Sequence, residues 1–403
     1  MIPYKSKVPY DYETRRKYID IPFPLEEYRD RVGKVRRMME ERELDALLVY
    51  SNPAGSEGSG HLTYLTSFAP LGGNAALLLP LDGEPTLVFD RVFHSEPTHS
   101  MNWTTWVRDV HPSTRGDLPA NIQAWIEGNR LQGGRIGLVG EAMLPWDVWN
   151  RTREALPNVS WVRVTRPFND IQMVKSPREM ELMRRVCAIT NEGMRAGVEA
   201  VAPGATEGEV IGEVCREFYR QGAHDFSFNP CIASGPRGGL KHSYPTDREI
   251  RRGDLVYIDV GAKLYGYNTD MSRVVVAEEP SSAQRELLDV DREAYYALLE
   301  EMRPGVHVRE IQGMAEEMER RSGIGERYGE GTYLRFAGSH ALSTGFAEWS
   351  LEDGRTVLEP NLSPLAFEPM IVILDVGTVV IESMVAITEK GTEVLTPFEV
   401  DWM

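Results

Sequence analysis

The sequence predicts an α/β (α+β) protein of two domains. The chain has 403 residues, more than one ordinary hydrophobic core accommodates. In its first part, strand-like runs such as Asp45–Tyr50 and Arg135–Val139 alternate with helix-like segments such as Leu25–Glu41, the order of an α/β domain. The pair Asp82-Gly83 lies between two apolar runs and predicts a β-hairpin. In the second part, two helix pairs each precede strand-like segments, which indicates helices that cover a β-sheet.

The boundary between the two domains is predicted within Arg166–Lys175, where a strong helix start follows. Ser176 can cap the helix, Pro177 suits its first position, and Glu179 completes a capping box. Apolar residues then recur at three- and four-residue spacing, which predicts an amphipathic helix. We therefore expect domains of residues 1–168 and 169–403.

An internal repeat is predicted in the second domain. Residues 203–210 read Pro-Gly, four variable residues, Glu and an aliphatic residue, and residues 304–311 follow the same pattern. In the first copy, Thr206 and Glu209 form another capping box, with Glu207 as the first helical residue. We interpret the match as a pseudo-twofold duplication. The glycine-rich run Gly235–Gly239 is interpreted as a flexible turn, with anion binding by its backbone amides as the weaker alternative.

Composition excludes several classes of protein. The formal net charge of −17 argues against nucleic-acid binding, which needs clustered Lys and Arg. No run approaches the length of an apolar membrane span, and the polar N-terminus does not resemble a secretory signal. Three cysteines without a CxxC pair indicate reduced thiols. A cytoplasmic protein without a nucleic-acid or membrane partner is expected.

Candidate metal ligands stand out as acidic residues within otherwise apolar, strand-like segments. Asp259 interrupts such a run, and Asp270 opens the next strand eleven residues later. Glu368 and Glu382 each end or interrupt another apolar run, and His340 lies among small residues between the two pairs. A buried charge is costly unless it is paired or binds a metal ion. Facing carboxylates repel each other, and a cation removes that repulsion.

Four carboxylates and one imidazole suit Mn²⁺, Co²⁺, Fe²⁺ or Zn²⁺. A single ion would rarely use four acids, whereas two ions that share bridging carboxylates would. Such a pair of ions can hold a water molecule, lower its pKa and polarise the bond under attack. Each residue taken alone is more often structural than functional. The five together, ordered along predicted strands, predict a dinuclear metal enzyme.

These residues resemble the pita-bread metallopeptidases, the group of Xaa-Pro dipeptidase (prolidase), aminopeptidase P, methionine aminopeptidase and the creatinases. The order and spacing of the two Asp, the His and the two Glu residues match that family. The resemblance extends over nearly the whole chain, including a signature of the creatinase and prolidase N-terminal domain. The matching segments are His61–Phe68, Val174–Glu179, His242–Pro245 and Arg252–Gly261.

The resemblance implies a creatinase-like N-terminal α/β domain followed by a pita-bread catalytic domain. It implies that Asp259, Asp270, His340, Glu368 and Glu382 bind two divalent ions, with Asp270 and Glu382 bridging both. Glu368 would also act as general base. His242 would stabilise the oxyanion or the leaving group. The implied activity is hydrolysis of an amide (C–N) bond in a small molecule or short peptide, with Xaa-Pro peptides as the leading substrate class, and the implied assembly is a homodimer.

Three positions depart from the proline-specific members of the family. Those enzymes carry a second His seven residues after the metal-binding His, where this chain has Ala347. They often carry an Arg two residues before the last Glu, where this chain has Val380. Aminopeptidase P has a further His four residues before the metal-binding His, where this chain has Phe336.

Two other functions therefore stay open. One is a diverged relative that acts on a non-peptide molecule, as creatinase, the ectoine hydrolases and the dimethylsulfoniopropionate lyases do. Of these, creatinase works without metal. The other is a non-catalytic binding module, although such proteins usually lose ligands that this chain retains.

Overall fold

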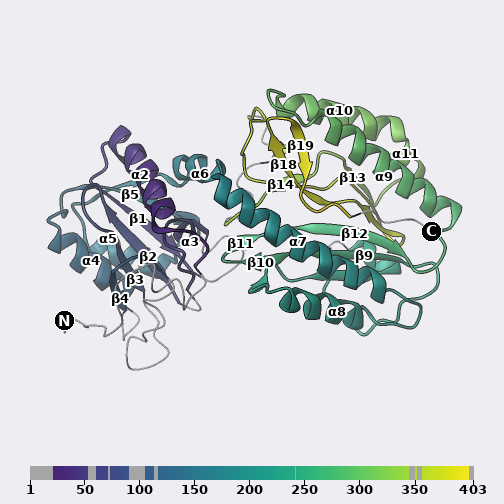
Figure 1. Cartoon of the computed structure of the whole chain (residues 1–403), viewed down its shortest axis with the longest axis horizontal. Helices are drawn as coiled ribbons and strands as arrows, with labels where there is room; N and C mark the ends of the chain where they lie inside the picture. Colours follow the sequence, from purple (N-terminus) through teal and green to yellow (C-terminus); the bar gives the residue numbers. More distant parts are fainter. Residues whose placement is uncertain are drawn as a thin grey trace. The chain divides into compact units, whose positions relative to one another are not determined.

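The structure is a computed structural model that describes residues 21–52, 60–70, 73–89, 105–112, 117–240, 242–344, 350–351 and 356–398. The chain forms two compact units, Met1–Gln172 and Met173–Met403. The predicted α/β organisation is confirmed in both units (Figure 1). The domain limits 1–168 and 169–403 stay a prediction, and their boundary falls inside helix α6, Thr165–Met173.

The first unit is built on one six-stranded sheet in the order β4-β3-β2-β1-β5-β6. The predicted hairpin is present, since β2 and β3 pair antiparallel on either side of Gly83, whose φ of 116° suits glycine. The strands are β1 (Ala46–Ser51), β2 (Ala75–Pro80), β3 (Thr86–Phe89), β4 (Asp109–Pro112), β5 (Arg135–Val139) and β6 (Ser160–Arg163). The helices include α2 (Leu25–Glu41), α3 (Gly60–Thr66), α4 (Leu118–Gly128) and α5 (Trp146–Ala155), with a 3-10 turn η2 (Glu141–Met143).

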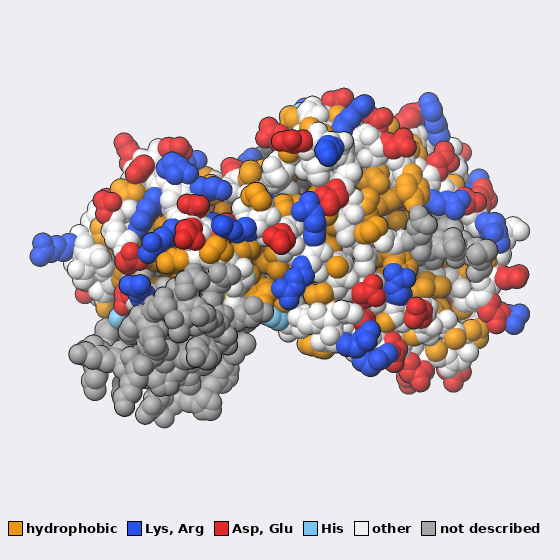
Figure 2. Space-filling model, viewed as in Figure 1, with side chains coloured by type: hydrophobic (Ala, Val, Ile, Leu, Met, Phe, Trp, Pro, Cys, Tyr) orange, Lys and Arg blue, Asp and Glu red, His pale blue; other side chains and the backbone are white. Residues whose placement is uncertain are grey.

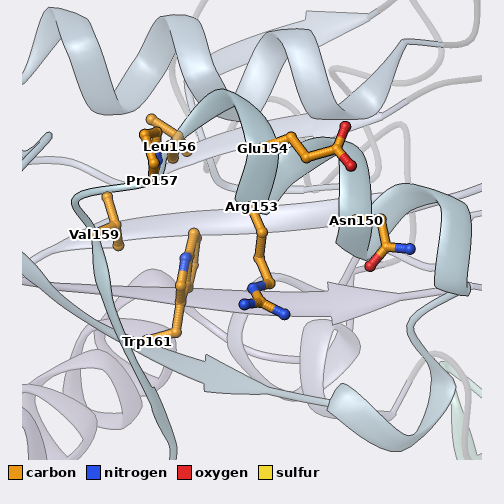
Figure 3. Close-up of a pocket in the computed structure, with 7 residues that line it drawn as sticks. All are labelled: Asn150, Arg153, Glu154, Leu156, Pro157, Val159 and Trp161. Carbon is orange, nitrogen blue, oxygen red and sulfur yellow. The ribbon is translucent and has the colours of Figure 1, made fainter.

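A pocket of about 400 Å³ lies in the first unit, between α5 and β6 (Figure 3). Its lining includes none of the residues that the sequence singles out for chemistry. The lining residues are Asn150, Arg153, Glu154, Leu156, Pro157, Val159 and Trp161.

The helices of the second unit begin where their capping boxes predict. Ser176 accepts a hydrogen bond from Glu179 N, and Thr206 accepts one from Glu209 N. Ser281 caps its helix in the same way. These helices are α7 (Pro177–Ala200), α8 (Glu207–Arg220), α9 (Ser282–Glu301), α10 (Val308–Ser322) and α11 (Ile324–Tyr328).

The internal repeat is visible in equivalent backbone hydrogen bonds. Gly204 N donates to Ile250 O, and Ile250 N donates back to Ala205 O. In the second copy, Gly305 N donates to Leu358 O, and Leu358 N donates back to Val306 O. Both glycines have positive φ, 91° and 86°, so each Pro-Gly turn needs its glycine. In both copies, the Pro-Gly turn between the two helices is thus hydrogen-bonded to a later segment of the chain.

The strands of the second unit form several small sheets that the helix pairs cover (Figure 1). Helices α7 and α8 contact strands β8 to β12, while α9 and α10 contact β13, β16 and β17. The strands are β7 (Asp225–Phe226), β8 (Cys231–Ser234), β9 (Leu255–Val260), β10 (Ala262–Leu264), β11 (Tyr267–Asn268), β12 (Met271–Val276), β13 (Thr332–Arg335), β14 (Ser339–Ala341), β15 (Leu365–Phe367), β16 (Met370–Ile373), β17 (Gly377–Val380), β18 (Ser383–Thr388) and β19 (Gly391–Val394). A 3-10 turn, η3 (Gly235–Gly239), follows β8.

The surface carries both signs of charge. On the face that Figure 2 shows, acidic and basic side chains of the described residues are interspersed over both units. None of the helices that the structure describes is long and apolar enough to cross a bilayer.

Candidate metal centre

Strand pairing brings the two predicted aspartates together. Asp259 lies near the end of β9, and Asp270 directly precedes β12. The two strands are antiparallel, with Ser272 opposite Asp259 and Met271 opposite Val260. Every residue of β9 is buried, and Asp259 is the one acidic residue of this strand.

The other three predicted ligands come from a second set of paired strands. His340 lies on β14, opposite Ala366 of β15, and Glu368 directly follows β15. Glu382 occupies the short connection between β17 and β18, and Ser383 of β18 pairs with Phe367. The register therefore places Glu368 and Glu382 at the same end of neighbouring strands.

The side chains of all five residues lie in one group, in which the four acidic residues are buried and His340 is partly buried. His340 Nε2 lies 3.0 Å from Asp270 Oδ2, and His340 Nδ1 lies 3.7 Å from Glu368 Oε1. Asp270, His340 and Glu382 each offer one ligand atom, and these atoms lie within 4.8 Å of one another. Asp259 and Glu368 are close enough to Glu382 that their charges shift its pKa.

The group carries more negative charge than its surroundings neutralise. The pKa of Glu382 is held well above its usual value, first by burial and then by the charges of Asp270, Glu368 and Asp259, while His340 acts in the opposite direction. The four carboxylates are only 2–6% exposed. Within the described residues, Glu382 Oε1 has no hydrogen-bond partner. Oxygen and imidazole ligands, net negative charge and an oxygen without a donor together fit divalent metal ions.

Tyr257 and Ser272 hold two of the carboxylates, although the sequence did not mark either residue as functional. Tyr257 Oη donates a 2.6 Å hydrogen bond to Asp259 Oδ2, and Ser272 Oγ donates one of 2.6 Å to Glu382 Oε2. Burial, followed by the charges of Asp259 and Glu382, raises the pKa of Tyr257 well above its usual value, so the hydroxyl remains a donor. The sequence held one signal for them, because residues two apart in a strand lie on the same face. Tyr257 is two residues from Asp259, and Ser272 is two residues from Asp270.

Arg335 is a second residue that the sequence did not indicate. Its Nη1 atom donates a 3.1 Å hydrogen bond to Glu368 Oε1, and its side chain is 26% exposed. Met370 of β16 pairs with Arg335 on one side and with Val380 on the other. In this three-stranded sheet, the cationic Arg335 on β13 and the apolar Val380 on β17 therefore lie on either side of Met370.

Arg273 connects the main chain of Glu382 to the C-terminal segment. It is 2% exposed, and its guanidinium donates to the carbonyl oxygens of Ser272, Glu382, Thr396 and Phe398. A buried guanidinium with several carbonyl acceptors stiffens the backbone that it joins. The position of Glu382 thus depends on residues beyond its own strand.

The remaining predicted positions lie outside this group. His242 is exposed, has a φ of 65°, and makes no hydrogen bond or ion pair within the described part of the chain. Val380 and Phe336 are each 1% exposed and belong to the apolar core. Ala347 lies outside the described residues.

The fold and this cluster of candidate ligands are those of a metallopeptidase of the pita-bread type. Residues 181–389 match metallopeptidase family M24, and residues 31–174 match the creatinase/prolidase N-terminal domain. The chain belongs to metallopeptidase family M24, as its sequence resemblance predicts. It is accordingly a metal-dependent peptidase by family.

Similar proteins cover nearly the whole chain. An Xaa-Pro dipeptidase of Pyrococcus horikoshii is 27% identical over 373 residues, 92% of this chain and 97% of that protein. An uncharacterized peptidase of Bacillus subtilis, YqhT, is 30% identical over 368 residues, 91% of this chain and 97% of that protein. The solved structure of the prolidase from Pyrococcus furiosus has a TM-score of 0.75 and 26% identity, and the match covers 91% of this chain and all of that one.

Proposed function

We propose that this chain hydrolyses the amide bond of Xaa-Pro dipeptides with two divalent ions bound by Asp259, Asp270, His340, Glu368 and Glu382. The single observation that carries the proposal is the convergence of these five side chains in one group. The similarity to Xaa-Pro dipeptidases over more than nine tenths of the chain supports the substrate class. When bound, divalent ions lower the pKa of water and polarise a carbonyl oxygen.

The chain's own residues would supply orientation and proton transfer. Asp270, His340 and Glu382 would help to hold the ions, because their ligand atoms lie within 4.8 Å of one another. Glu368 would accept a proton from the attacking water, because its carboxylate is oriented by Arg335 at 3.1 Å. Tyr257 and Ser272 would hold Asp259 and Glu382 in place. His242 would donate to the developing oxyanion or to the leaving nitrogen.

A second candidate function is favoured by the apolar residues at two positions of the second unit. Val380 and Phe336 are buried where proline-specific relatives carry Arg or His. Without those polar groups, the site would accept a different small C–N substrate, as in creatinase-like or ectoine-hydrolase-like enzymes, or a substrate like that of the dimethylsulfoniopropionate lyases.

A substrate panel separates the two functions. The protein is stripped with a chelator and reloaded with Mn²⁺, Co²⁺, Fe²⁺ or Zn²⁺, and each form is assayed on Ala-Pro, Gly-Pro, longer Xaa-Pro peptides, creatine, ectoine and dimethylsulfoniopropionate. Rapid cleavage of the dipeptides supports the first proposal. Turnover of only a non-peptide substrate supports the second. Activity that survives complete metal removal contradicts the metal-dependent mechanism.

We further propose two ions per chain, manganese as one suitable metal, a homodimer and a cytoplasmic location. Metal analysis after dialysis should return about two equivalents, since four carboxylates and a histidine suit a dinuclear site. Light scattering coupled to size exclusion should return twice the mass of the 45.5 kDa chain. A single equivalent of metal would contradict the proposal of two ions, and the mass of a monomer would contradict the proposed homodimer.

A further inference from the structure

Glu207 is a carboxylate outside the metal centre that accepts five hydrogen bonds from described residues. It is the first residue of α8 and is 0% exposed. Ser234 donates to Glu207 Oε1 from both N and Oγ, each at 2.8 Å. Thr246 donates to Glu207 Oε2 from N at 3.0 Å and from Oγ1 at 2.7 Å. One carboxylate therefore joins two points of the chain that are twelve residues apart.

Arg237 extends this connection into the segment between those two points. Its Nη1 atom donates to Glu207 Oε2, and its Nη2 atom donates a 3.0 Å hydrogen bond to Tyr244 O. At the start of the segment, Ser234 is also bound by Arg248, which donates to Ser234 Oγ. Arg248 donates a second hydrogen bond, of 2.7 Å, to Asp254 Oδ2. Charge-assisted hydrogen bonds of this kind are roughly twice as strong as neutral ones.

The glycine-rich run is part of the same arrangement, not the flexible turn that its composition suggested. It forms the 3-10 turn η3, and Thr378 Oγ1 of β17 donates a 2.6 Å hydrogen bond to Gly238 O. A Cβ atom at Gly239 would lie 2.9 Å from Ile373 O, and one at Gly235 would lie 2.6 Å from Asp254 Oδ1. The run therefore packs against β17 and the end of β16, and the space at Gly235 and Gly239 is too small for a side chain.

His242 lies inside this secured segment. It has no partner of its own within the described residues, it is exposed, and its φ of 65° is unfavourable for a non-glycine residue. Such a conformation persists only where the surrounding structure determines it. Hydrogen bonds on both sides of His242 lead to Glu207 or to Arg237, which Glu207 binds. Two further bonds in the segment do not, since Ser243 Oγ donates to Leu240 O and Thr378 Oγ1 donates to Gly238 O.

We propose that Glu207 is a positioning residue that holds segment 234–246, and with it His242, in one conformation. This inference rests on the proposed role of His242 in turnover. Glu207 acts through Ser234, Arg237 and Thr246, and it touches neither the substrate nor the metal ligands.

The test compares Glu207→Gln with Glu217→Gln in the full-length, metal-loaded protein. Glu217 is a matched control, because it is a buried glutamate on the same helix that binds Arg220 and Gln221 instead of the segment. Backbone amides of residues 235–246 should exchange with deuterium about tenfold faster in Glu207→Gln, since a charged acceptor is lost. The kcat should fall about tenfold while the affinity for Mn²⁺ changes less than about twofold, as expected for a lost orienting contact. Glu217→Gln should change neither quantity.

Exchange of residues 235–246 at the parent rate would overturn the proposal, and so would an equal change in Glu217→Gln. If Glu207→Gln does not fold, Arg237→Gln serves instead, because it removes one arm of the connection from a partly exposed side chain. That variant should speed exchange near Tyr244, and unchanged exchange there would overturn the proposal. His242→Ala tests the proposed function separately. If its kcat equals that of the parent, His242 has no part in turnover, and exchange in Glu207→Gln still decides whether Glu207 holds the segment.

Discussion

Glu207 and Glu382 are both buried glutamates of the second unit, yet their surroundings are opposite. Burial acts to raise the pKa of Glu207, but hydrogen bonds from Thr246, Ser234 and Arg237 outweigh it and hold that pKa below its usual value. The pKa of Glu382 is raised by burial and by three neighbouring carboxylates. Ser272 donates to one of its oxygens, and the other has no hydrogen-bond partner within the described residues.

The difference separates a structural carboxylate from one suited to a cation. A buried charge is tolerated when donors of the protein satisfy it. Glu207 has those donors, so it stabilises the fold as it stands. Glu382 has one such donor, Ser272, and three acidic neighbours, so its surroundings suit a cation. The same residue type therefore serves two purposes, which the donors around it determine.

The largest expected effect is the loss of activity in Glu382→Gln. The variant removes a proposed metal ligand, and metal ions supply several kcal/mol of transition-state stabilisation. We expect kcat/KM to fall by at least about 1000-fold, which corresponds to about 4 kcal/mol. Metal content and kinetics are measured together. Full activity with full metal occupancy in this variant would remove Glu382 from the ligand set.

Tyr257→Phe should weaken metal binding without unfolding the protein. The substitution deletes the hydroxyl that donates to Asp259 at 2.6 Å and leaves the buried ring in place. Groups that orient metal ligands typically contribute about 10–100-fold to affinity or activity. Titration calorimetry with Mn²⁺ on the metal-free protein measures the affinity. Ser272→Ala provides the comparison on the Glu382 side, and unchanged affinity in both variants would contradict the role of these hydroxyls.

Glu207→Gln and Glu382→Gln should change the stability of the metal-free protein in opposite directions. The pKa of Glu207 is lowered on folding, so its contribution is present above the unfolded pKa and is lost as the pH falls. At neutral pH, Glu207→Gln should reduce the free energy of unfolding by about 1.5–3 kcal/mol, because hydrogen bonds to a charged group are lost.

The pKa of Glu382 is raised on folding, so the opposite sign applies. The contribution of protonated Glu382 to the free energy of unfolding is fully present below the unfolded pKa. It is lost as the pH rises through the folded pKa. The Gln side chain has no such proton to lose, so Glu382→Gln should become more stable than the parent as the pH rises above the unfolded pKa of a glutamate. Urea unfolding in the presence of a chelator measures both variants. Destabilisation of the same size in both would show that the two glutamates are equivalent.

The smallest effect is expected at Arg335, which orients Glu368 from a partly exposed position. Partly exposed ion pairs contribute little, so Arg335→Gln should lower kcat by less than about tenfold. Arg335→Lys should recover part of the loss, although lysine lacks the planar fork of arginine. Steady-state kinetics with a dipeptide and its C-terminal amide measure the effect. A larger effect on the free acid would indicate that Arg335 also contacts the substrate carboxylate.

Much of the candidate site was predictable because the candidate ligands are unusual residues for the segments that contain them. An acid inside or directly beside an apolar, strand-like run is conspicuous in a sequence, and the four acidic candidates have that property. The residues that hold them are ordinary in their segments. Tyr257 is a common strand residue, and Arg335 resembles any surface arginine until β13 pairs with β16. The two departures at Val380 and Phe336 were also visible, but their burial in the core was not.

The sequence by itself determined the two-domain α/β fold, the helix starts at Ser176 and Thr206, the repeated Pro-Gly turns and the set of five ligand candidates. These features depend on local chemistry, namely capping, glycine conformation and the periodicity of apolar residues. Only the tertiary structure decided that Glu207, a helix-start residue in the sequence, is the anchor of a segment 27 to 39 residues away. Contacts of that kind depend on which donors the folded chain brings to a buried carboxylate, and no local pattern specifies them.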